Sequence, residues 1–105
     1  LEGLLDIMDF EEVYRLLAQV PKGRITTYKE LAHAMGTKAY QLIGRAMNQN
    51  PYAPEIPCHR VVKSDATLGG YAHGPSKKRR MLEAEGIRIE DGKIKDFEEL
   101  LYTFT

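Results

Sequence analysis

Two short helical patterns separated by a turn occupy residues 27–48, TYKELAHAMGTKAYQLIGRAMN. Thr27 and Glu30 form a capping box, which predicts a helix start, and Gly36 is the residue type that commonly ends a helix. Thr37 is suited to cap a second helix from about residue 38 to 48, with Tyr40, Ile43 and Met47 expected on one face. Two helices joined by a glycine-containing turn predict a helix-turn-helix, a motif that binds DNA in some domains and only packs in others.

The segments around this pair predict a helix before it and an extended connector after it. Asp9 and Glu12 form another capping box, ahead of an apolar helical pattern that stops at Pro21. Residues 24–26 follow as a short extended piece. Prolines at 51, 54 and 57 favour a rigid, extended chain because they fix φ and remove backbone donors.

The second half of the chain predicts short strands and one further long helix. Residues 59–62 are apolar enough for a buried strand, and residues 63–71 form a loop that Gly69-Gly70 closes. Pro75 is typical of a first helical position, in a helix ending at Gly86. Asp91-Gly92 predicts a hairpin, and residues 97–102 an amphipathic segment packed on the core. The predicted fold is α+β, mainly helical, with short strands, in one domain spanning residues 1–105.

Composition indicates a soluble globular protein. Of the 105 residues, 43% are hydrophobic and 29% are charged. No apolar run approaches the roughly 18–20 residues of a membrane span. The net charge is zero, but residues 20–80 contain eleven basic and three acidic side chains. This basic centre is compatible with a nucleic-acid surface and equally with an ordinary solvated, salt-bridged surface.

Cys58 is the only cysteine, and it lies in the string Ile56-Pro57-Cys58-His59-Arg60-Val61-Val62. A single cysteine excludes an internal disulfide and fits a reducing compartment. A thiol beside an imidazole and a guanidinium has the surroundings of an activated nucleophile. A lone cysteine is, however, more often a small buried hydrophobe.

The cysteine motif, in its context, resembles that of the O6-alkylguanine-DNA alkyltransferases, the methylated-DNA–protein-cysteine methyltransferases. The resemblance extends from about residue 10 to 89 and includes, in order, Gly23 to Tyr28, Ile43 to Met47 with Asn50-Pro51, the cysteine motif, Gly69-Gly70-Tyr71 and Glu85-Gly86. It implies a winged helix-turn-helix domain that transfers a methyl or larger alkyl group from guanine in DNA to Cys58, once per molecule, after flipping the base out of the duplex.

The resemblance implies that Cys58, His59 and Glu85 are the catalytic residues. His59 would act as the base and Glu85 would orient it. Because adjacent residues of a strand point to opposite faces, Cys58 and His59 are not expected to touch directly. As in the family, a water is expected between thiol and imidazole.

The resemblance also assigns the residues that hold the substrate. The base pocket would be formed by Tyr28, Met47, Asn50, Val61, Tyr71, Ala72 and Lys78. The carbonyls of Cys58 and Val61 would accept the exocyclic amine. DNA would be contacted by Thr27, Tyr40, Gln41, Leu42, Gly44, Arg45 and Arg60.

Several positions depart from the family pattern. Gln41 replaces the finger arginine that enters the base stack, and it provides no charge-assisted contact. Tyr40 and Leu42 are larger than the usual small residues of this helix. Ala72 and His73 replace a common serine and glycine at the pocket rim. The family's amino-terminal domain is expected to be absent.

Two alternatives remain at this point. One is a non-catalytic alkyltransferase-like protein that binds alkylated guanine and recruits other repair factors, although that group characteristically lacks the cysteine. The other is a winged-helix DNA-binding module with a vestigial site. Zinc at Cys58 with His33, His59 or His73 is not expected, since structural sites are usually richer in cysteine. We expect no cofactor or metal, a monomer that binds double-stranded DNA and no membrane, and a cytoplasmic, nucleoid-associated location, or a nuclear one in a eukaryote.

Overall fold

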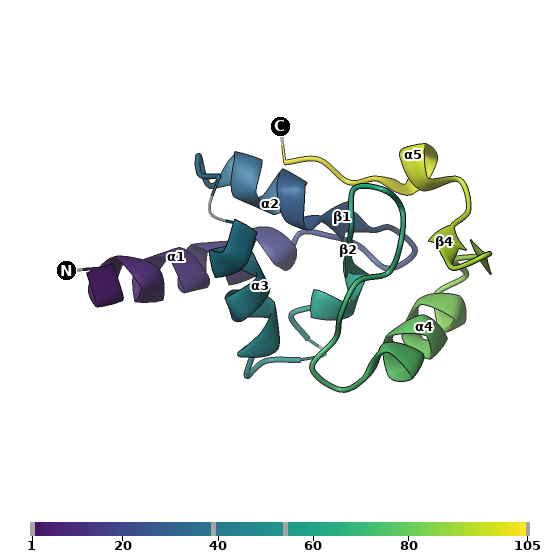
Figure 1. Cartoon of the computed structure of the whole chain (residues 1–105), viewed down its shortest axis with the longest axis horizontal. Helices are drawn as coiled ribbons and strands as arrows, with labels where there is room; N and C mark the ends of the chain where they lie inside the picture. The colour runs from purple at the N-terminus through teal and green to yellow at the C-terminus, as the bar shows by residue number, and fades with distance from the viewer. Residues whose placement is uncertain (1, 39, 54, 105) are drawn as a thin grey trace.

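The computed structural model describes residues 2–38, 40–53 and 55–104, with side chains described from residue 10 onward. The elements, in chain order, are α1 (Glu2–Leu17), β1 (Thr26–Thr27), α2 (Tyr28–Ala34), α3 (Tyr40–Asn48), the 3₁₀ turn η1 (Cys58–Arg60), β2 (Val61–Val62), α4 (Pro75–Ala84), β3 (Ile89–Glu90), β4 (Lys93–Ile94) and α5 (Phe97–Leu100). Helices α1, α2 and α3 lie on one side of the β1–β2 pair, and α4, the β3–β4 hairpin and α5 lie on the other (Figure 1).

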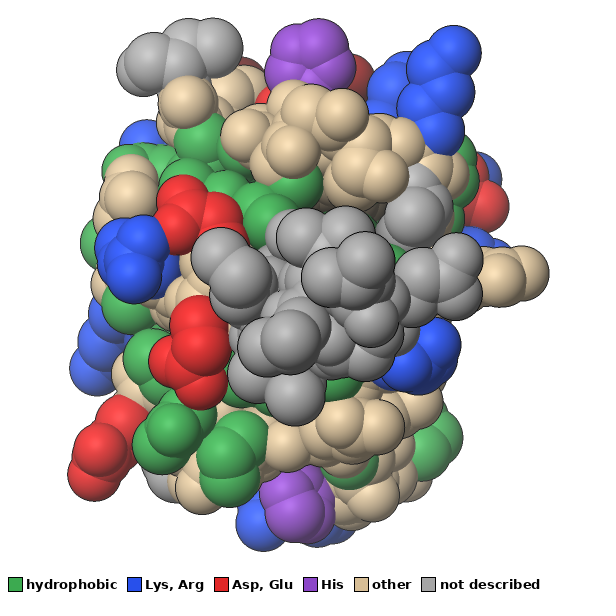
Figure 2. Space-filling model, turned by 90° about the vertical axis from the view of Figure 1, so that its left-hand side faces the viewer, with side chains coloured by type: hydrophobic (Ala, Val, Ile, Leu, Met, Phe, Trp, Pro, Cys, Tyr) green, Lys and Arg blue, Asp and Glu red, His purple; other side chains and the backbone are tan. Residues whose placement is uncertain are grey.

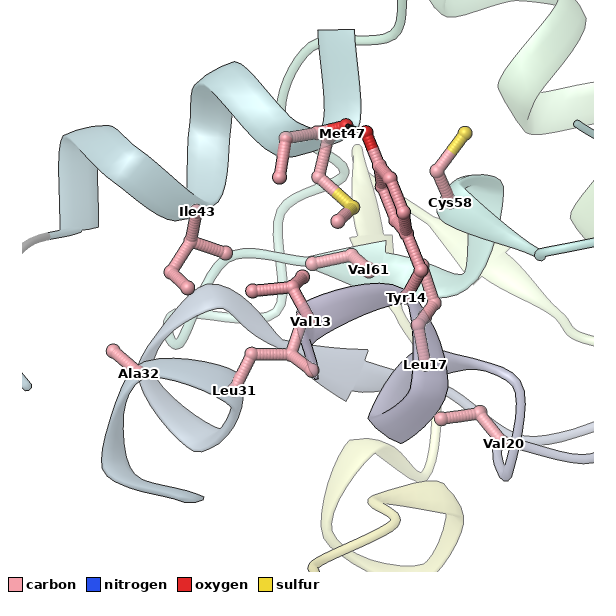
Figure 3. Close-up of a cluster of buried hydrophobic side chains, with 11 residues drawn as sticks. Val13, Tyr14, Leu17, Val20, Leu31, Ala32, Ile43, Met47, Cys58 and Val61 are labelled. Carbon is pink, nitrogen blue, oxygen red and sulfur yellow. Dashed lines mark hydrogen bonds between the residues drawn. The ribbon is translucent and has the colours of Figure 1, made fainter. Parts of the chain in front are cut away.

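The two strands in the middle separate two apolar clusters. β1 and β2 are parallel, with Thr26 opposite Val61 and Thr27 opposite Val62. Since successive strand residues point to opposite faces, Val61 packs with α1, α2 and α3, while Val62 packs with α4 and the hairpin. The first cluster includes Leu31 and Ile43, both fully buried (Figure 3). Burying a side chain of this size contributes roughly 1.5–3 kcal/mol.

The helix-turn-helix prediction is confirmed in its main features. The Thr27 hydroxyl accepts a hydrogen bond from the Glu30 amide at 2.9 Å and so caps α2. Gly36 follows the helix with φ of +72°, a conformation that glycine adopts without strain. Helix α3 begins at Tyr40, two residues later than predicted, and Ala39 between Lys38 and this start lies outside the described residues.

One face of α3 was expected to contain Tyr40, Ile43 and Met47. The residues of the helix that the fold buries are Leu42, Ile43, Ala46 and Met47. Tyr40, the first residue of the helix, is 49% exposed.

The ends of two other elements also differ from prediction. Asp9 was expected to cap α1, but the helix begins at Glu2, because residues 2–8 contain enough good helix formers to continue it backward. The segment after Asn50 turns instead of extending. The Ile56 amide bonds the Tyr52 carbonyl at 3.0 Å, a turn that Asn50-Pro51 also favours. Pro54 lies outside the described residues.

The carboxyl-terminal third follows the sequence pattern closely. Pro75 is the first residue of α4, and Gly86 follows the helix with φ of +89°. Asp91 and Gly92 both have positive φ in the tight turn between β3 and β4, as an Asp-Gly hairpin requires. The chain after α5 then runs along β1, where the Tyr102 amide bonds the Ile25 carbonyl at 2.7 Å.

Ala66 generates a prediction about stability, because its φ of +74° is unfavourable for a residue with a Cβ. Ala66→Gly should remove this strain and raise the free energy of unfolding by roughly 0.5–1 kcal/mol, measured by urea denaturation. Ala84→Gly, at the end of α4, is the matched control and should lower stability, since glycine disfavours helices. A destabilised Ala66→Gly variant would contradict the argument.

Candidate active site

Cys58 lies in the 3₁₀ turn η1, and its neighbour His59 belongs to the same turn and not to a strand. The Arg60 amide bonds the Pro57 carbonyl at 2.9 Å, and the Val61 amide bonds the carbonyl of Cys58. The prediction of a strand over residues 59–62 is therefore right only for Val61 and Val62, because hydrophobicity over so few residues does not separate a buried strand from a buried turn. Cys58 is 4% exposed and lies at the edge of the first cluster, with its sulfur directed away from Leu17 (Figure 3).

His59 and Glu85 form the predicted pair. Nε2 of His59 lies 2.8 Å from Oε2 of Glu85, and the imidazole is almost fully buried. Since an ionised carboxylate can only accept, Nε2 carries the proton and Nδ1 is left as the acceptor nitrogen. Nδ1 is buried without a hydrogen-bond partner among the described residues. This nitrogen is therefore free to accept a proton.

The pKa values of the pair support this assignment. Burial lowers the pKa of His59, and the hydrogen bond and charge of Glu85 offset that effect only in part. Burial alone would raise the pKa of Glu85, but hydrogen bonds from Arg60 and His59 outweigh it, so the pKa is lowered. At neutral pH the imidazole is therefore uncharged and the carboxylate is ionised, the states that a base and its orienting group need.

Arg60 belongs to the same network. Its Nε and Nη2 donate to the two oxygens of Glu85 at 2.9 and 2.8 Å, and Nη1 donates to the Val20 carbonyl at 2.9 Å. Its side chain is 15% exposed. The structure therefore gives Arg60 an internal role, bonding both carboxylate oxygens and a backbone carbonyl. That Arg60 also contacts DNA stays a prediction.

Thr27 and Leu42 were also predicted to contact DNA, and the fold buries both side chains. Thr27 is 3% exposed, and its hydroxyl caps α2. Leu42 is 9% exposed. The resemblance placed both residues among the DNA contacts, but it did not determine which way each side chain points.

The other α3 residues predicted to meet DNA are accessible. Tyr40, Gln41 and Arg45 are exposed, and Gly44 is partly exposed. A Cβ built on Gly44 would meet nothing within 4 Å, so packing inside the protein does not require glycine there. Arg45 also lies over the Phe10 ring, with its guanidinium carbon 5.9 Å from the ring centroid.

A cavity of about 330 Å³ opens beside α3. It is lined by Tyr28, Gly44, Met47, Asn48, Lys63, Gly69 and Gly70. Tyr28 and Met47 are thus together, as predicted for the base pocket, and burial raises the pKa of the Tyr28 hydroxyl, which keeps it protonated. Sequence reasoning did not assign Asn48 or Lys63 to this site. Asn48 is the last residue of a predicted helix and Lys63 directly follows a predicted strand, and at the end of an element the direction of a side chain is hard to predict from a pattern.

The remaining predicted pocket residues are not among those that line this cavity. Tyr71 donates to the Met81 sulfur at 3.6 Å, and Ala72 is exposed. Asn50 holds the turn before the cysteine: its Nδ2 donates to the Ile56 carbonyl at 2.8 Å, and its Oδ1 accepts from the Tyr52 amide at 2.9 Å. Asn50 therefore positions Pro57 and Cys58.

Lys78 is a buried cation behind the cavity. It is 0% exposed, and Nζ donates to the carbonyls of Val61 and Gly70 at 2.5 and 3.0 Å. Burial lowers its pKa to about 8, and the charge of a Cys58 thiolate acts in the opposite direction. The carbonyl of Val61, predicted to accept from the base, thus already accepts from Lys78. The sequence contains one sign of this burial. Lys78 precedes the core residue Leu82 by four positions, and residues four apart lie on the same face of a helix.

Other kinds of site find no support in the described part of the chain. No group of three or more His, Cys, Asp or Glu residues there is arranged to hold a metal ion. Among the same residues, no helix combines the length and apolarity needed to cross a membrane. On the face shown in Figure 2, both carboxylates and cations lie among the described side chains around the grey atoms.

Comparison with known proteins identifies the family. The profile described as "6-O-methylguanine DNA methyltransferase, DNA binding domain" matches residues 9–87. A methylated-DNA–protein-cysteine methyltransferase of Methanosarcina barkeri is 46% identical over 79 residues, which are 73% of this chain and 50% of the relative. The chain spans between 29% and 51% of the length of the first curated relatives it matches.

Solved structures agree on the fold. The O6-methylguanine-DNA methyltransferase of Pyrococcus kodakaraensis has a TM-score of 0.69 and 40% identity, covering 74% of this chain and 46% of that one. Schizosaccharomyces pombe Atl1, solved with damaged DNA containing O6-carboxymethylguanine, has a TM-score of 0.79 and 26% identity, covering 92% of this chain and 96% of that one. The winged-helix prediction is thereby confirmed, and the chain belongs to the 6-O-methylguanine DNA methyltransferase family, whose DNA-binding domain it contains.

Proposed function

We propose that this protein repairs DNA by transferring a methyl or larger alkyl group from O6 of guanine to Cys58, once per molecule. The observation that carries the proposal concerns His59, the residue next to the cysteine. Its Nδ1 has no hydrogen-bond partner among the described residues, and the bond from Nε2 to Glu85 makes this Nδ1 an acceptor. A neutral imidazole with a fixed acceptor is the group that an uncharged thiol needs, because the thiolate is the nucleophile.

In the proposed reaction, His59 takes the thiol proton, directly or through one water, and Sγ of Cys58 attacks the alkyl carbon. A carbon–sulfur bond forms as the carbon–oxygen bond breaks, and the electron pair leaves with guanine O6. The guanine then regains a proton, for which the protonated Tyr28 hydroxyl in the adjoining cavity is the nearby donor. The thioether is stable, so no second turnover follows.

DNA is the proposed partner, and α3 the proposed docking element. Tyr40, Gln41, Gly44 and Arg45 leave α3 accessible, and the cavity beside Gly44 leads toward Met47. The lesion must leave the duplex to reach a buried thiol, as is general for chemistry on a base. We further propose that the protein is a monomer located with the genomic DNA.

A second candidate function is a lesion-binding protein without transfer activity. It is favoured by one observation: Atl1 is matched over 96% of its length, whereas the P. kodakaraensis enzyme is matched over 46%. Cys58 with the His59–Glu85 pair favours transfer, because a protein that only binds needs no oriented base.

Intact mass separates the two functions. After incubation with duplex DNA containing O6-methylguanine, the protein should gain one methyl group, located on the Cys58 peptide. Cys58→Ser should gain none while binding the same duplex, since a serine hydroxyl is a far weaker nucleophile. An unmodified wild-type protein that still prefers the damaged duplex would establish the lesion-binding alternative.

The His59–Glu85 pair predicts a distinctive pH dependence. His59→Ala should slow transfer by about 10²–10⁴-fold, the usual contribution of a general base. Glu85→Gln should also slow transfer. Because Glu85 raises the pKa of His59, this variant should move the acidic limb of the rate profile to lower pH.

The exposed neighbour Glu83, which pairs with Arg79, supplies the control for this test. Glu83→Gln should leave the rate and its pH profile unchanged. Circular dichroism must show that each variant is folded. An unaltered profile in a folded His59→Ala variant would remove His59 from the mechanism.

Lys78 predicts an alkaline limit to activity. Its pKa of about 8 means that the buried positive charge near Cys58 is lost as the pH rises through that value. The rate of reaction with free alkylated guanine should therefore decline above about pH 8. Lys78→Met should be slower at neutral pH and lack this decline, whereas Lys77→Met, on the exposed side of α4, should behave as wild type. A decline that persists in Lys78→Met would assign it to another group.

A further inference from the structure

A second cavity adjoins the one beside Met47. It has a volume of about 530 Å³, within the range of roughly 300–1,000 Å³ typical of ligand pockets. Its lining residues are Tyr28, Lys29, Tyr40, Lys63, Ser64 and Asp65. Tyr28 and Lys63 line both cavities, so the two are neighbours.

Close packing fixes the boundary between the cavities. A Cβ on Gly69 would lie 3.3 Å from Cγ of Lys63 and 3.4 Å from the Tyr28 ring. The Lys63 stem and the Tyr28 ring therefore both rest against the Gly69 backbone. Lys63, which lines both cavities, therefore lies at their junction.

The second cavity combines an exposed ring with two cations. Tyr40 is 49% exposed, and only Tyr52 is comparable among the large hydrophobic side chains of the described residues. Within the same residues, Lys29 and Lys63 have no carboxylate at salt-bridge distance. The Asp65 carboxylate also lines the cavity, where its Oδ1 accepts from the amide and hydroxyl of Thr67 and its charge interacts with that of Lys63. The two lysines nevertheless outnumber this one carboxylate in the lining.

We propose that this cavity binds the nucleotide next to the extruded guanine on the same DNA strand. Its base would stack on Tyr40, and its phosphate would lie between Lys29 and Lys63. Aromatic stacking with cations along the backbone is the general way in which proteins hold unpaired nucleotides. The same strand is assigned because Tyr28 and Lys63 line both cavities, and a strand that places one nucleotide beside Met47 must pass them.

This subsite rests on the proposed function, since it needs a guanine extruded into the first cavity. It also bears on Gln41, which has no guanidinium plane to place against the bases. Tyr40, one residue earlier, supplies a planar ring at the amino-terminal end of the same helix. The binding energy of the opened duplex would then come from a neighbouring nucleotide held on this ring.

The test measures binding of Cys58→Ser protein, which does not alter the DNA, to a fluorescent duplex with one O6-methylguanine. Tyr40→Ala in this background should weaken binding about 5- to 150-fold, the range for loss of one base–aromatic stack. Tyr40→Phe should stay within about two-fold, because the ring remains. Tyr52→Ala is the matched control, and this variant should bind as the parent does. Tyr52 is about as exposed as Tyr40, but its ring contacts Tyr14 of α1.

A change in the DNA identifies the stacked base. An abasic analogue is placed on the 5′ or the 3′ side of the lesion. At one of these two positions, the abasic analogue should weaken binding of the protein that retains Tyr40 by the same factor as Tyr40→Ala does. At that position, the affinity of the Tyr40→Ala variant should be the same for the abasic duplex as for the intact one. Lys29→Ala and Lys63→Ala should each reduce the slope of log affinity against log salt by about one, and the exposed Lys77→Ala should not.

Two results would overturn the subsite. One is a Tyr40→Ala protein that binds like Tyr52→Ala. The other is an abasic penalty that is equal with and without Tyr40 at both positions. If either occurs while Cys58 of the wild type gains a methyl group, the proposed function stands and only the subsite fails. If the damaged duplex is neither preferred nor a methyl donor, both proposals fail together.

Discussion

The carboxylate of Glu85 is the interaction on which the rest of the site depends. It lies just after α4 and accepts from His59 and from two nitrogens of Arg60, both in the turn that carries Cys58. Arg60 extends the connection to the carbonyl of Val20. Three separate parts of the chain are thus fixed by one anion. Leaving such a group without partners in the interior costs several kcal/mol, so the network forms as a unit. The same anion sets the tautomer of His59 and makes its other nitrogen an acceptor.

The two short strands β1 and β2 determine where this network lies in the fold. Val61 and Val62 point into different apolar clusters, so the chain just before them, Cys58 to Arg60, lies at the boundary between the clusters. Lys78 strengthens that boundary from the α4 side by bonding the Val61 and Gly70 carbonyls. A buried ammonium is costly, and the lowered pKa of Lys78 is the measure of that cost. Its charge also lies near the thiol, where it favours the thiolate. Structure and chemistry therefore use the same buried cation.

The proposed docking surface and the proposed reactive thiol lie in different layers of the molecule. α3 is held from behind by α1, since the hydroxyl of Tyr14 donates to the Ala46 carbonyl at 2.9 Å. Its outer residues are left accessible, and the two cavities open along it. The thiol lies one layer deeper. This separation would allow the surface of α3 to vary at Tyr40 and Gln41 without a change in the cysteine network. Substitutions on the outer layer do not disturb the packing that positions His59.

The sequence alone determined the order of elements, the capped start of α2, the Asp-Gly hairpin, the family and the pairing of His59 with Glu85. These follow from local chemistry or from motifs whose spacing is preserved. It did not determine where α1 begins, that the chain turns after Asn50, or that Cys58 to Arg60 form a 3₁₀ turn. In each case the hydrophobic pattern is compatible with more than one local structure. Nor did it reveal that Arg60, Thr27 and Leu42 point inward, or that Lys78 is buried within the basic run of α4. The direction of a side chain depends on partners distant in sequence: Glu85 for Arg60, and the Val61 and Gly70 carbonyls for Lys78. Those partners come into contact only once the two apolar clusters have formed.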